Sequence, residues 1–381
     1  MKICFFDFIT LVGGATKGTV YLLERLKAKG INVHAINVYG DCEEYLDDLI
    51  SSNIDYDILL KKNIKNTTIG FNDNYFRRLF EILKQLPHVL LILIKLLAVI
   101  IKVKPTHLMV NNRKSLFFVF LFKYFFRFKI VYYNRIEATS CKFPKYLIFL
   151  LNFSVDFLLS HSKNSIFQMK NLGVNKNIIY LPNCVKINKN LFKIDKNNNM
   201  PFTIFLNAGR IVKEKGYHTA LYALNELVKA KYNVVLKLPG FPTDNSYLNE
   251  LKVYIQKNNL EDRVIFCNWI ENIQQEIVNS QCMILPSYSE GFPRSIIEAM
   301  LLGVPVCATP VGGIPEAIID NETGFLFDVE DHLTLSNKIE SLINDIDLYN
   351  KISENAYDYA LQNFSESINT QIFIKTVKSY D

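Results

Sequence analysis

The chain has 381 residues and a formal net charge of +6, with 49% hydrophobic and 21% charged residues. This composition excludes an intrinsically disordered chain, and the length exceeds the size at which one hydrophobic core usually stops growing. Two domains of similar size are therefore expected.

The first half of the chain predicts a parallel sheet that is covered by helices. A strand over residues 2–8 leads into a turn at Gly13 and Gly14, then a helix over 17–29 that Gly30 ends, then a strand over 31–38. Further strands are predicted over residues 106–111, 129–133, 157–161 and 177–181. This alternation is typical of a Rossmann-type layer.

The second half repeats the alternation of short apolar strands and amphipathic helices. Strands are predicted over residues 202–207, 234–238, 264–268, 282–286 and 304–308. Residues 186–201 are polar, rich in asparagine and without periodicity, which is typical of an interdomain linker. We expect one domain over residues 1–188 and a second over 189–361, with residues 362–381 crossing back to complete the first.

Two apolar stretches of the first half raise the question of a membrane. The run over residues 89–101 is interrupted by Lys95, and the run over 117–128 carries Lys123 and Arg127. Both are shorter than the roughly 20 residues that a spanning helix requires, so neither is expected to cross a bilayer. They are either buried helices or faces that lie on an anionic leaflet, and the basic residues around them favour the leaflet.

Charge is distributed unevenly between the halves. Residues 1–200 carry 29 Lys and Arg against 14 Asp and Glu, a balance of +15, whereas residues 201–381 carry 14 against 23, a balance of −9. Such a basic first half favours an anionic partner, here the membrane rather than a nucleic acid. The seven cysteines form no CxxC pair and no secretory signal is evident, so we expect a cytoplasmic protein, peripheral at the inner face of the cell membrane.

The segment EGFPRSIIEAMLLG over residues 290–303 directly follows an apolar strand. Pro293 suits the first turn of a helix, and Gly303 suits its left-handed end. Glu290 would then lie in the loop at the carboxyl end of the strand and Glu298 about one turn into the helix, so both can face one crevice. Because helix N-termini bind phosphate and open α/β sheets bind ligands at these strand ends, the expected ligand is anionic and carries hydroxyl groups.

A second segment, NAGRIVKEKG over residues 207–216, also follows a predicted strand. It offers Arg210, a rigid fork of donors, and Lys215, a mobile point charge. Together they suit a diphosphate whose charge must be neutralised as a sugar–phosphate bond breaks. Taken alone, such a pair is usually a solvated surface, so this interpretation depends on the acidic segment lying nearby.

These motifs resemble those of the family 4 retaining glycosyltransferases. That family carries two glutamates separated by seven residues, matched by Glu290 and Glu298, and an Arg and a Lys in a GR-x4-KG loop, matched by Arg210 and Lys215. Similar stretches are PNCV from residue 182, VPVCATPVGGIPEAI from 304, ETGFLF from 322 and GGATKGTVYLLERLKAKG from 13. The resemblance implies the α/β GT-B fold, in which two Rossmann-like domains face a central cleft, the first binding the acceptor and the second the nucleotide-sugar donor.

The resemblance also implies roles for individual residues. Glu298 would bind the ribose of the donor nucleotide, and Glu290, with the backbone of residues 291–294, would bind the donor sugar. Arg210 and Lys215 would stabilise the diphosphate as it leaves, and Gly13 and Gly14 would let a loop approach the phosphates. The candidate catalytic residues are Arg210, Lys215 and Glu290; the donor-binding set is Gly13, Gly14, Gly209, Arg210, Lys215, Glu290, Gly291, Phe292, Pro293, Arg294 and Glu298.

Such enzymes use no protein nucleophile. The acceptor oxygen attacks from the face that the diphosphate leaves, and a phosphate oxygen takes the proton, so electrostatic stabilisation is the main contribution of the protein. The glutamate pair is therefore not a hydrolase acid and nucleophile. One departure is a histidine that many members carry at a strand end of the first domain: Asn111, Asn112, Asn134 and Arg135 occupy those ends here, and His107 and His161 are expected to be core or capping residues.

No metal or cofactor is expected. The DxD triplets at residues 55–57 and 345–347 are attributed to chance in an acid-rich chain, and no His or Cys cluster has ligand spacing. The absence of a GxGxxG after the first strand and of a P-loop lysine makes nicotinamide and ATP chemistry poor interpretations.

The leading hypothesis is transfer of a hexose or N-acetylhexosamine from a UDP- or GDP-sugar to a glycan or lipid-linked acceptor in surface polysaccharide biosynthesis (capsule, O-antigen or exopolysaccharide). One alternative is a catalytically silent partner subunit of a membrane glycosyltransferase complex, which the missing histidine favours. Another is a GT-B sugar-nucleotide epimerase or a phosphorylase, although no pyridoxal-binding lysine motif is evident.

Overall fold

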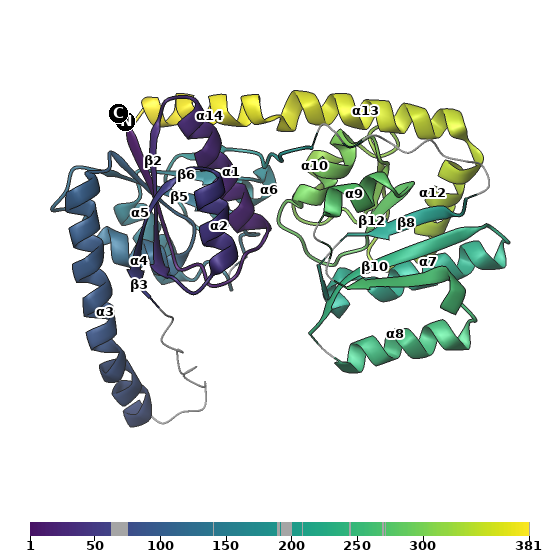
Figure 1. Ribbon diagram of the computed structural model, residues 1–381, viewed down its shortest axis with the longest axis horizontal. Coiled ribbons are helices and arrows are strands. Elements are labelled where there is room, and N and C mark those ends of the chain that lie inside the picture. Colours follow the sequence, from purple (N-terminus) through teal and green to yellow (C-terminus); the bar gives the residue numbers. More distant parts are fainter. Residues whose placement is uncertain are drawn as a thin grey trace. The chain divides into compact units, whose positions relative to one another are not determined.

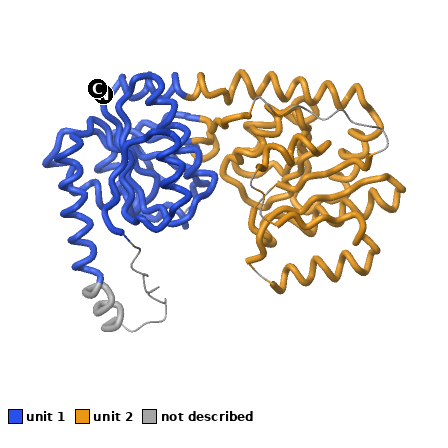
Figure 2. Tube along the Cα trace, in the orientation of Figure 1, with its two compact units in different colours: residues 1–160, 166–181, 370–381 blue, residues 161–165, 182–369 orange. Residues whose placement is uncertain are grey.

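The protein is described by a computed structural model that covers residues 1–61, 75–139, 141–188, 191, 200–207, 209–243, 245–268, 270 and 272–380, with only the helical backbone of 75–84. The chain forms two compact units (Figure 2). The first contains Met1–Ser160, Ile166–Leu181 and Thr370–Asp381, and the second contains His161–Ser165 and Pro182–Asn369. The predicted linker over residues 186–201 lies largely outside the described residues, and so does the start of the predicted second domain at residue 189.

The described part of the first unit is built on a seven-stranded parallel sheet (Figure 1) with the order β3-β2-β1-β4-β5-β6-β7. Its strands are β1 (Lys2–Asp7), β2 (Asn32–Tyr39), β3 (Asp55–Leu60), β4 (His107–Val110), β5 (Lys129–Asn134), β6 (Phe157–Ser160) and β7 (Ile178–Tyr180). The first six follow the Rossmann order, in which the winding reverses between β1 and β4. Strand β3 was not predicted from the sequence, because it begins with polar residues and lacks a full apolar run.

Helices cover both faces of this sheet. They are α1 (Gly14–Ala28), α2 (Glu43–Ser51), α3 (Tyr75–Val103), α4 (Arg113–Phe120), α5 (Lys145–Ser154), α6 (Lys163–Asn171), whose first three residues belong to the second unit, and the C-terminal helix α14 (Glu366–Lys378), most of which belongs to the first.

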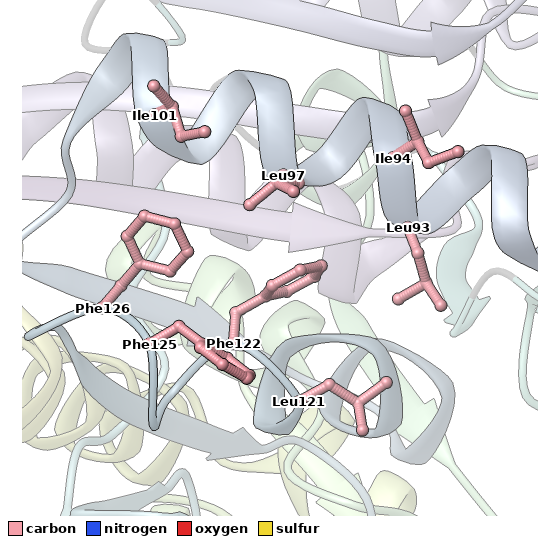
Figure 3. Close-up of a pocket in the computed structure, with 8 residues that line it drawn as sticks. All are labelled: Leu93, Ile94, Leu97, Ile101, Leu121, Phe122, Phe125 and Phe126. Atoms are coloured by element: carbon pink, nitrogen blue, oxygen red, sulfur yellow. The ribbon is translucent and has the colours of Figure 1, made fainter.

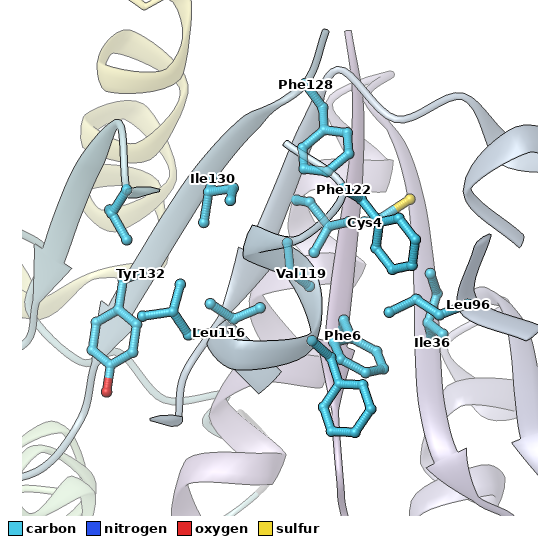
Figure 4. Packing of buried hydrophobic residues seen from close by; sticks show 14 of the residues in the cluster. Cys4, Phe6, Ile36, Leu96, Leu116, Val119, Phe122, Phe128, Ile130 and Tyr132 are labelled. Carbon is cyan, nitrogen blue, oxygen red and sulfur yellow. The ribbon is translucent and has the colours of Figure 1, made fainter. Parts of the chain in front are cut away.

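Successive side chains of a strand point to opposite faces, so β1 supplies two cores. Phe6 packs with residues of α3 and α4 (Figure 4), and Phe5 packs on the other face. Phe373 and Val377 of α14 are buried in this second core. Residues Thr370–Asp381 belong to the first unit, whereas residues 362–369, which were also expected there, belong to the second.

Helix α3 is longer than the sequence pattern predicted. Residues Gln85–Val103 form a 19-residue stretch with a mean hydropathy of 2.4, which is long and apolar enough to cross a membrane by length and composition. The prediction that this segment is too short was therefore wrong. Lys95 does not interrupt the helix, because its Nζ donates to the carbonyl oxygen of Leu59 at 2.7 Å while the helical backbone continues. The second apolar run contains the end of α4 at Phe120 and a turn.

The described part of the second unit contains another parallel sheet, with the order β11-β10-β8-β12-β13-β14 and β9 paired to β10. Its strands are β8 (Phe202–Leu206), β9 (Gly209–Ile211), β10 (Val234–Pro242), β11 (Val264–Asn268), β12 (Cys282–Leu285), β13 (Val306–Ala308) and β14 (Phe325–Leu326). Its helices are η1 (Lys213–Lys215), α7 (Tyr217–Lys229), α8 (Asn245–Lys257), η2 (Glu261–Arg263), α9 (Ile273–Val278), α10 (Arg294–Leu301), α11 (Ile314–Ala317), α12 (His332–Asn344) and α13 (Ile346–Phe364).

The strand order of the second unit fixes where a ligand would bind. If β9 is set aside, β8, β10 and β11 run one way from the centre and β12, β13 and β14 the other. The winding therefore reverses between β8 and β12, and open α/β sheets bind ligands at the carboxyl ends of the strands that flank such a reversal. Residues 207–216 follow β8 and residues 286–293 follow β12, so both predicted site segments lie at this point.

Candidate functional site

The two loops at the reversal meet through an ion pair. Lys215 Nζ lies 2.6 Å from Glu290 Oε1, and the Ser287 hydroxyl donates to the same oxygen at 2.8 Å. The side chains of Lys215 and Glu290 are 26% and 12% exposed. A half-buried pair of this kind keeps a cation at a fixed place while it stays accessible to a ligand. The structure thus brings together one basic and one acidic residue of the predicted site.

Three glycines set the path of these loops. Gly216 has a left-handed φ of +67°, and a Cβ there would lie 2.0 Å from the carbonyl oxygen of Pro286. Gly312, with φ +59°, approaches the carbonyl oxygen of Glu290 in the same way, at 1.9 Å from a built Cβ. The amide of Gly313 donates to the carbonyl oxygen of Gly291 at 2.6 Å. A side chain at either left-handed position would displace the loop that positions Glu290.

Arg210 lies on the short strand β9. Residues 209–211 pair with residues 240–242 of β10, and the Arg210 side chain is exposed. The Lys215 side chain passes close to Gly209, because a Cβ built on that glycine would lie 3.8 Å from Cε of Lys215. The backbone pairing therefore orients Arg210 from a strand rather than from the free loop that the sequence predicted.

Helix α10 follows the Glu290 loop much as predicted. It begins at Arg294, one residue later than expected, with Pro293 as the residue that precedes its first turn. Gly303 has a φ of +66° and ends the helix in the left-handed conformation. Glu298, half-buried, stands one turn into the helix.

Phe292 has a different place from the other predicted donor-binding residues. Its side chain is only 5% exposed, and its ring packs against Phe364 with centroids 5.4 Å apart. The carbonyl oxygen of Phe292 accepts a hydrogen bond from the Asn183 amide at 2.8 Å. The ring therefore anchors the loop in the core of the second unit.

A chain of hydrogen bonds supports the loop from outside. His218 of α7 contacts Tyr247 Oη through Nδ1 at 2.7 Å and Tyr288 Oη through Nε2 at 2.9 Å, and Tyr288 donates to Glu330. The Tyr288 amide donates to the carbonyl oxygen of Glu214 at 2.8 Å, which joins the β12 loop to the β8 loop. Burial lowers the pKa of His218, so the ring is neutral near pH 7. Burial also raises the pKa of Tyr247 to about 12.

The first unit has a polar cluster at its own reversal between β1 and β4. Asp7 is 6% exposed, and its carboxylate accepts hydrogen bonds from the backbone amide of Phe8 and the side-chain amide of Asn112. Burial raises the pKa of Asp7. Asn112 also caps α4, since its Oδ1 accepts from the Ser115 amide at 2.9 Å. Asn112, which stands at a strand end where many family members carry a histidine, therefore has a structural role.

Gly13 and Gly14 also belong to the first unit. They precede and begin α1 after β1, both are exposed, and a Cβ built on either meets no atom within 4 Å. Their predicted contact with donor phosphates remains a prediction.

Neither of the two histidines considered from the sequence is exposed. His107 begins β4, is 1% exposed, and contacts the Thr106 hydroxyl through Nδ1 at 3.0 Å. His161 is also 1% exposed and its ring centroid lies 6.4 Å from that of Phe292. His161 thus packs beside Phe292 within the second unit.

Both DxD triplets have structural roles. Asp57 lies within β3, where it contacts Lys102 at 3.0 Å and His34 at 2.9 Å. Asp345 caps α13 by accepting from the Leu348 amide at 2.9 Å. Among the described residues, no three His, Cys, Asp or Glu side chains gather in a way that could bind a metal ion. The expectation that the site uses no metal remains a prediction.

Several supporting residues escaped the sequence interpretation. Ser287, Tyr288, His218, Glu330 and Gly312 meet at the site only because loops far apart in the chain fold together. The one available signal was local: Gly312 lies in the stretch TPVGGIPE, where adjacent glycines indicate a tight approach of backbones.

Comparison with known proteins addresses the second unit most directly. Residues 186–359 match the family model described as "Glycosyl transferases group 1". A capsular polysaccharide biosynthesis glycosyltransferase of Staphylococcus aureus, CapM, is 32% identical over 161 residues, which is 42% of each chain. An N,N'-diacetylbacillosaminyl-diphospho-undecaprenol alpha-1,3-N-acetylgalactosaminyltransferase of Campylobacter jejuni is 28% identical over 64% of this chain and 62% of its own. The chain thus spans less than two thirds of the length of these curated relatives.

Solved structures address the fold of the whole chain. The Anabaena protein Alr3699/HepE, solved in complex with UDP, superposes with a TM-score of 0.81 over 100% of both chains at 21% identity. At that identity the likeness concerns the fold. The chain therefore has the two-sheet α/β fold of the GT-B glycosyltransferases, and its residues 186–359 carry the pattern of glycosyl transferases group 1.

Proposed function

We propose that this protein is a retaining glycosyltransferase of family 4 that transfers a hexose or N-acetylhexosamine from a UDP- or GDP-sugar. The acceptor would be a glycan or lipid-linked glycan in surface polysaccharide biosynthesis. The observation that carries the proposal is the Lys215–Glu290 pair, 2.6 Å apart at the winding reversal of a unit that matches a glycosyl transferase model. The capsular and undecaprenol-linked activities in the names of two relatives support the choice of acceptor.

In this proposal the second unit binds the donor. Lys215 and Arg210 neutralise the diphosphate as the sugar–phosphate bond breaks, which is the step at which negative charge grows on the leaving group. Glu290, which accepts from both Lys215 and Ser287, keeps the ammonium group in place and binds sugar hydroxyls with its remaining acceptor sites. Glu298 binds the ribose. No metal or other cofactor takes part.

The proposal also places the protein at a membrane, peripheral to the cytoplasmic face. A lipid-linked acceptor would be presented there, and the basic balance of residues 1–200 supports contact with anionic lipid. The first unit would bind the acceptor.

The test is a transfer assay with purified protein, a panel of nucleotide sugars and a membrane lipid extract. We expect nucleoside diphosphate to be released with one class of nucleotide sugar. Arg210→Ala should lower kcat about 100-fold or more, the usual effect of removing a group that stabilises negative charge in the transition state. Glu298→Ala should raise KM for the donor. Lys252→Ala, which removes an exposed lysine of α8 in the same unit, is the matched control and should match the wild type. Unchanged rates in both site variants would refute the site assignment.

One observation favours a second candidate, a catalytically silent partner subunit. Asn112 is committed to a helix cap and to Asp7, and no histidine occupies that strand end. A silent partner would release no diphosphate from any donor in the presence of the lipid extract.

A further inference from the structure

The first unit exposes an apolar face that its own core does not cover. Helix α3 buries Ile92, Leu96 and Ile100 in the core, while Leu90, Ile94 and Ile101 on its other side are each more than half exposed. Large exposed apolar patches mark interaction sites, because soluble surfaces rarely carry them. The face of α3 that points away from the sheet therefore needs an apolar partner.

A groove runs along this face. Its volume is about 510 Å³, and it is lined by four side chains of α3 and four of the turn that follows α4 (Figure 3). Ile94, Leu97 and Ile101 form one wall, and Leu121 and Phe125 belong to the other. The eight lining side chains are all aliphatic or aromatic, and Phe125 is 81% exposed. A groove without polar groups selects hydrocarbon over any ligand that needs hydrogen bonds.

The apolar face continues beyond the groove onto α5. The ring of Tyr124, next to Phe125, lies 5.8 Å from that of Phe153, and Phe153 stacks on Phe149 at 5.8 Å between centroids. These three rings are 53% to 68% exposed. This surface extends further than a single acyl chain bound in the groove would cover. It suits the boundary between lipid headgroups and hydrocarbon, where aromatic side chains are favoured.

Basic residues are concentrated in the same part of the chain. Between residues 85 and 156 the acidic residues are Glu137 and Asp156, against eleven basic ones: Lys95, Lys102, Lys104, Arg113, Lys114, Lys123, Arg127, Lys129, Arg135, Lys142 and Lys145. Two of these lysines are paired, Lys102 with Asp57 and Lys123 with Asp156, which leaves a strong excess of positive charge. This charge argues against a second copy of the chain as the partner, since two such faces would repel each other. It matches an anionic leaflet, whose negative surface potential attracts basic segments.

We propose that the face formed by α3, the turn at residues 121–126 and α5, called here the α3–α5 face, docks on an anionic membrane, with Phe125 inserted and lipid hydrocarbon in the groove. The inference rests on the proposed function, because a lipid-linked acceptor is what would bring the protein to a membrane. Helix α3 lies along the bilayer rather than across it, because its inner side belongs to the core of the unit. This orientation presents the first unit to lipid-linked acceptors from the membrane side.

The test uses tryptophan as a depth probe. The chain contains one tryptophan, Trp269, whose emission in the wild type is subtracted. Phe125→Trp places a second on the α3–α5 face, and Val253→Trp places one on α8, where the native side chain is 62% exposed in the other unit. Both variants are mixed with vesicles of phosphatidylglycerol and phosphatidylcholine whose acyl chains are brominated, and then with vesicles of phosphatidylcholine alone.

On anionic vesicles we expect bromine to quench the added emission of the Phe125→Trp variant and not that of the Val253→Trp variant, with quenching that weakens as salt rises. In co-sedimentation, Phe125→Asp should reduce partition onto anionic vesicles at least about tenfold, the effect of withdrawing one aromatic side chain from hydrocarbon. Val253→Asp should leave partition unchanged. Equal quenching in both tryptophan variants, none in either, or binding that Phe125→Asp does not weaken would overturn the inference.

Nucleotide binding by the same variants separates this inference from the proposed function. Phe125→Asp should bind UDP or GDP as the wild type does, because Phe125 lies in the first unit. Intact nucleotide binding without vesicle binding overturns the membrane face alone. Vesicle binding without nucleotide binding overturns the proposed function alone.

Discussion

Glu290 is positioned by contacts to both its side chain and its backbone. Its carboxylate accepts from Lys215 and Ser287, and its carbonyl oxygen lies against Gly312. The sequence interpretation required the Lys215 and Glu290 segments to lie close together, and they do, but it predicted neither this ion pair nor the Ser287 hydrogen bond. The approach of Gly312 could not be predicted either, because packing of the whole unit decides which backbone segments meet.

The close approach of Gly312 leads to a stability prediction. Gly312→Ala should destabilise the protein about 1–3 kcal/mol more than Gly30→Ala, as expected for overpacking. Both glycines have positive φ, +59° and +77°, so both substitutions carry backbone strain, but only at Gly312 does the new Cβ meet backbone, at 1.9 Å. Urea unfolding of the two variants measures the difference. Equal losses of stability would mean that the loop relaxes freely and that Gly312 does not position Glu290.

At the scale of the element, His218 joins α7 to α8 and to the loop after β12. This residue is the second of α7, the helix after η1, and reaches Tyr247 of α8 and Tyr288 of the β12 loop. Burial lowers the pKa of His218 most, Lys213 lowers it further, and Glu330 and Glu250 oppose the shift. The folded protein therefore keeps the ring neutral at a pH where the unfolded chain, with a pKa near 6.5, already takes up a proton.

This shift predicts how stability depends on pH. The contribution of the neutral ring is complete above about pH 6.5 and is lost as pH falls toward the lower folded-state pKa, because only the unfolded state then gains a proton. His218→Gln should flatten the decline of the unfolding free energy between about pH 7 and pH 5, although His34 and His88 still contribute to it. Urea unfolding across this range measures the slope. Tyr247→Phe, which keeps the histidine, should retain the wild-type slope; a His218→Gln slope equal to that of the wild type would contradict the assignment.

The elements that the sequence predicted well are those with a full apolar run. Strands β1, β5, β8, β11 and β12 lie within one residue of their expected bounds. Strands β9 and β14 have three and two residues, too few for any periodicity to show, and β3 opens with alternating aspartates. The length of the apolar segment in α3 was underestimated for another reason: Lys95 in the apolar run was taken as an interruption, whereas its long stem carries the charge to a neighbouring carbonyl group.

At the scale of the whole molecule, the two halves of the chain differ in net charge and in the surface or site that each contains. The basic half contains the α3–α5 face, and the acidic half contains the Lys215–Glu290 site. The repeated Rossmann order places a polar cluster at the winding reversal of each sheet, around Asp7 in one and Glu290 in the other. The sequence indicated this division through its charge balance, but the groove on α3 required side-chain positions that no pattern supplies.

The central claim is that the second unit binds a nucleotide sugar through Glu290, Lys215 and Glu298. Calorimetric titration of the full chain with UDP and with GDP tests it most directly, with Glu298→Ala beside the wild type and Lys252→Ala as the control. We predict that one nucleotide binds the wild type with a Kd at or below about 1 mM, the usual upper range for enzyme substrates. Glu298→Ala should weaken that binding about tenfold or more, because it removes hydrogen bonds to a charged acceptor, while Lys252→Ala does not. Binding of neither nucleotide, or equal binding by Glu298→Ala and the wild type, would contradict the account.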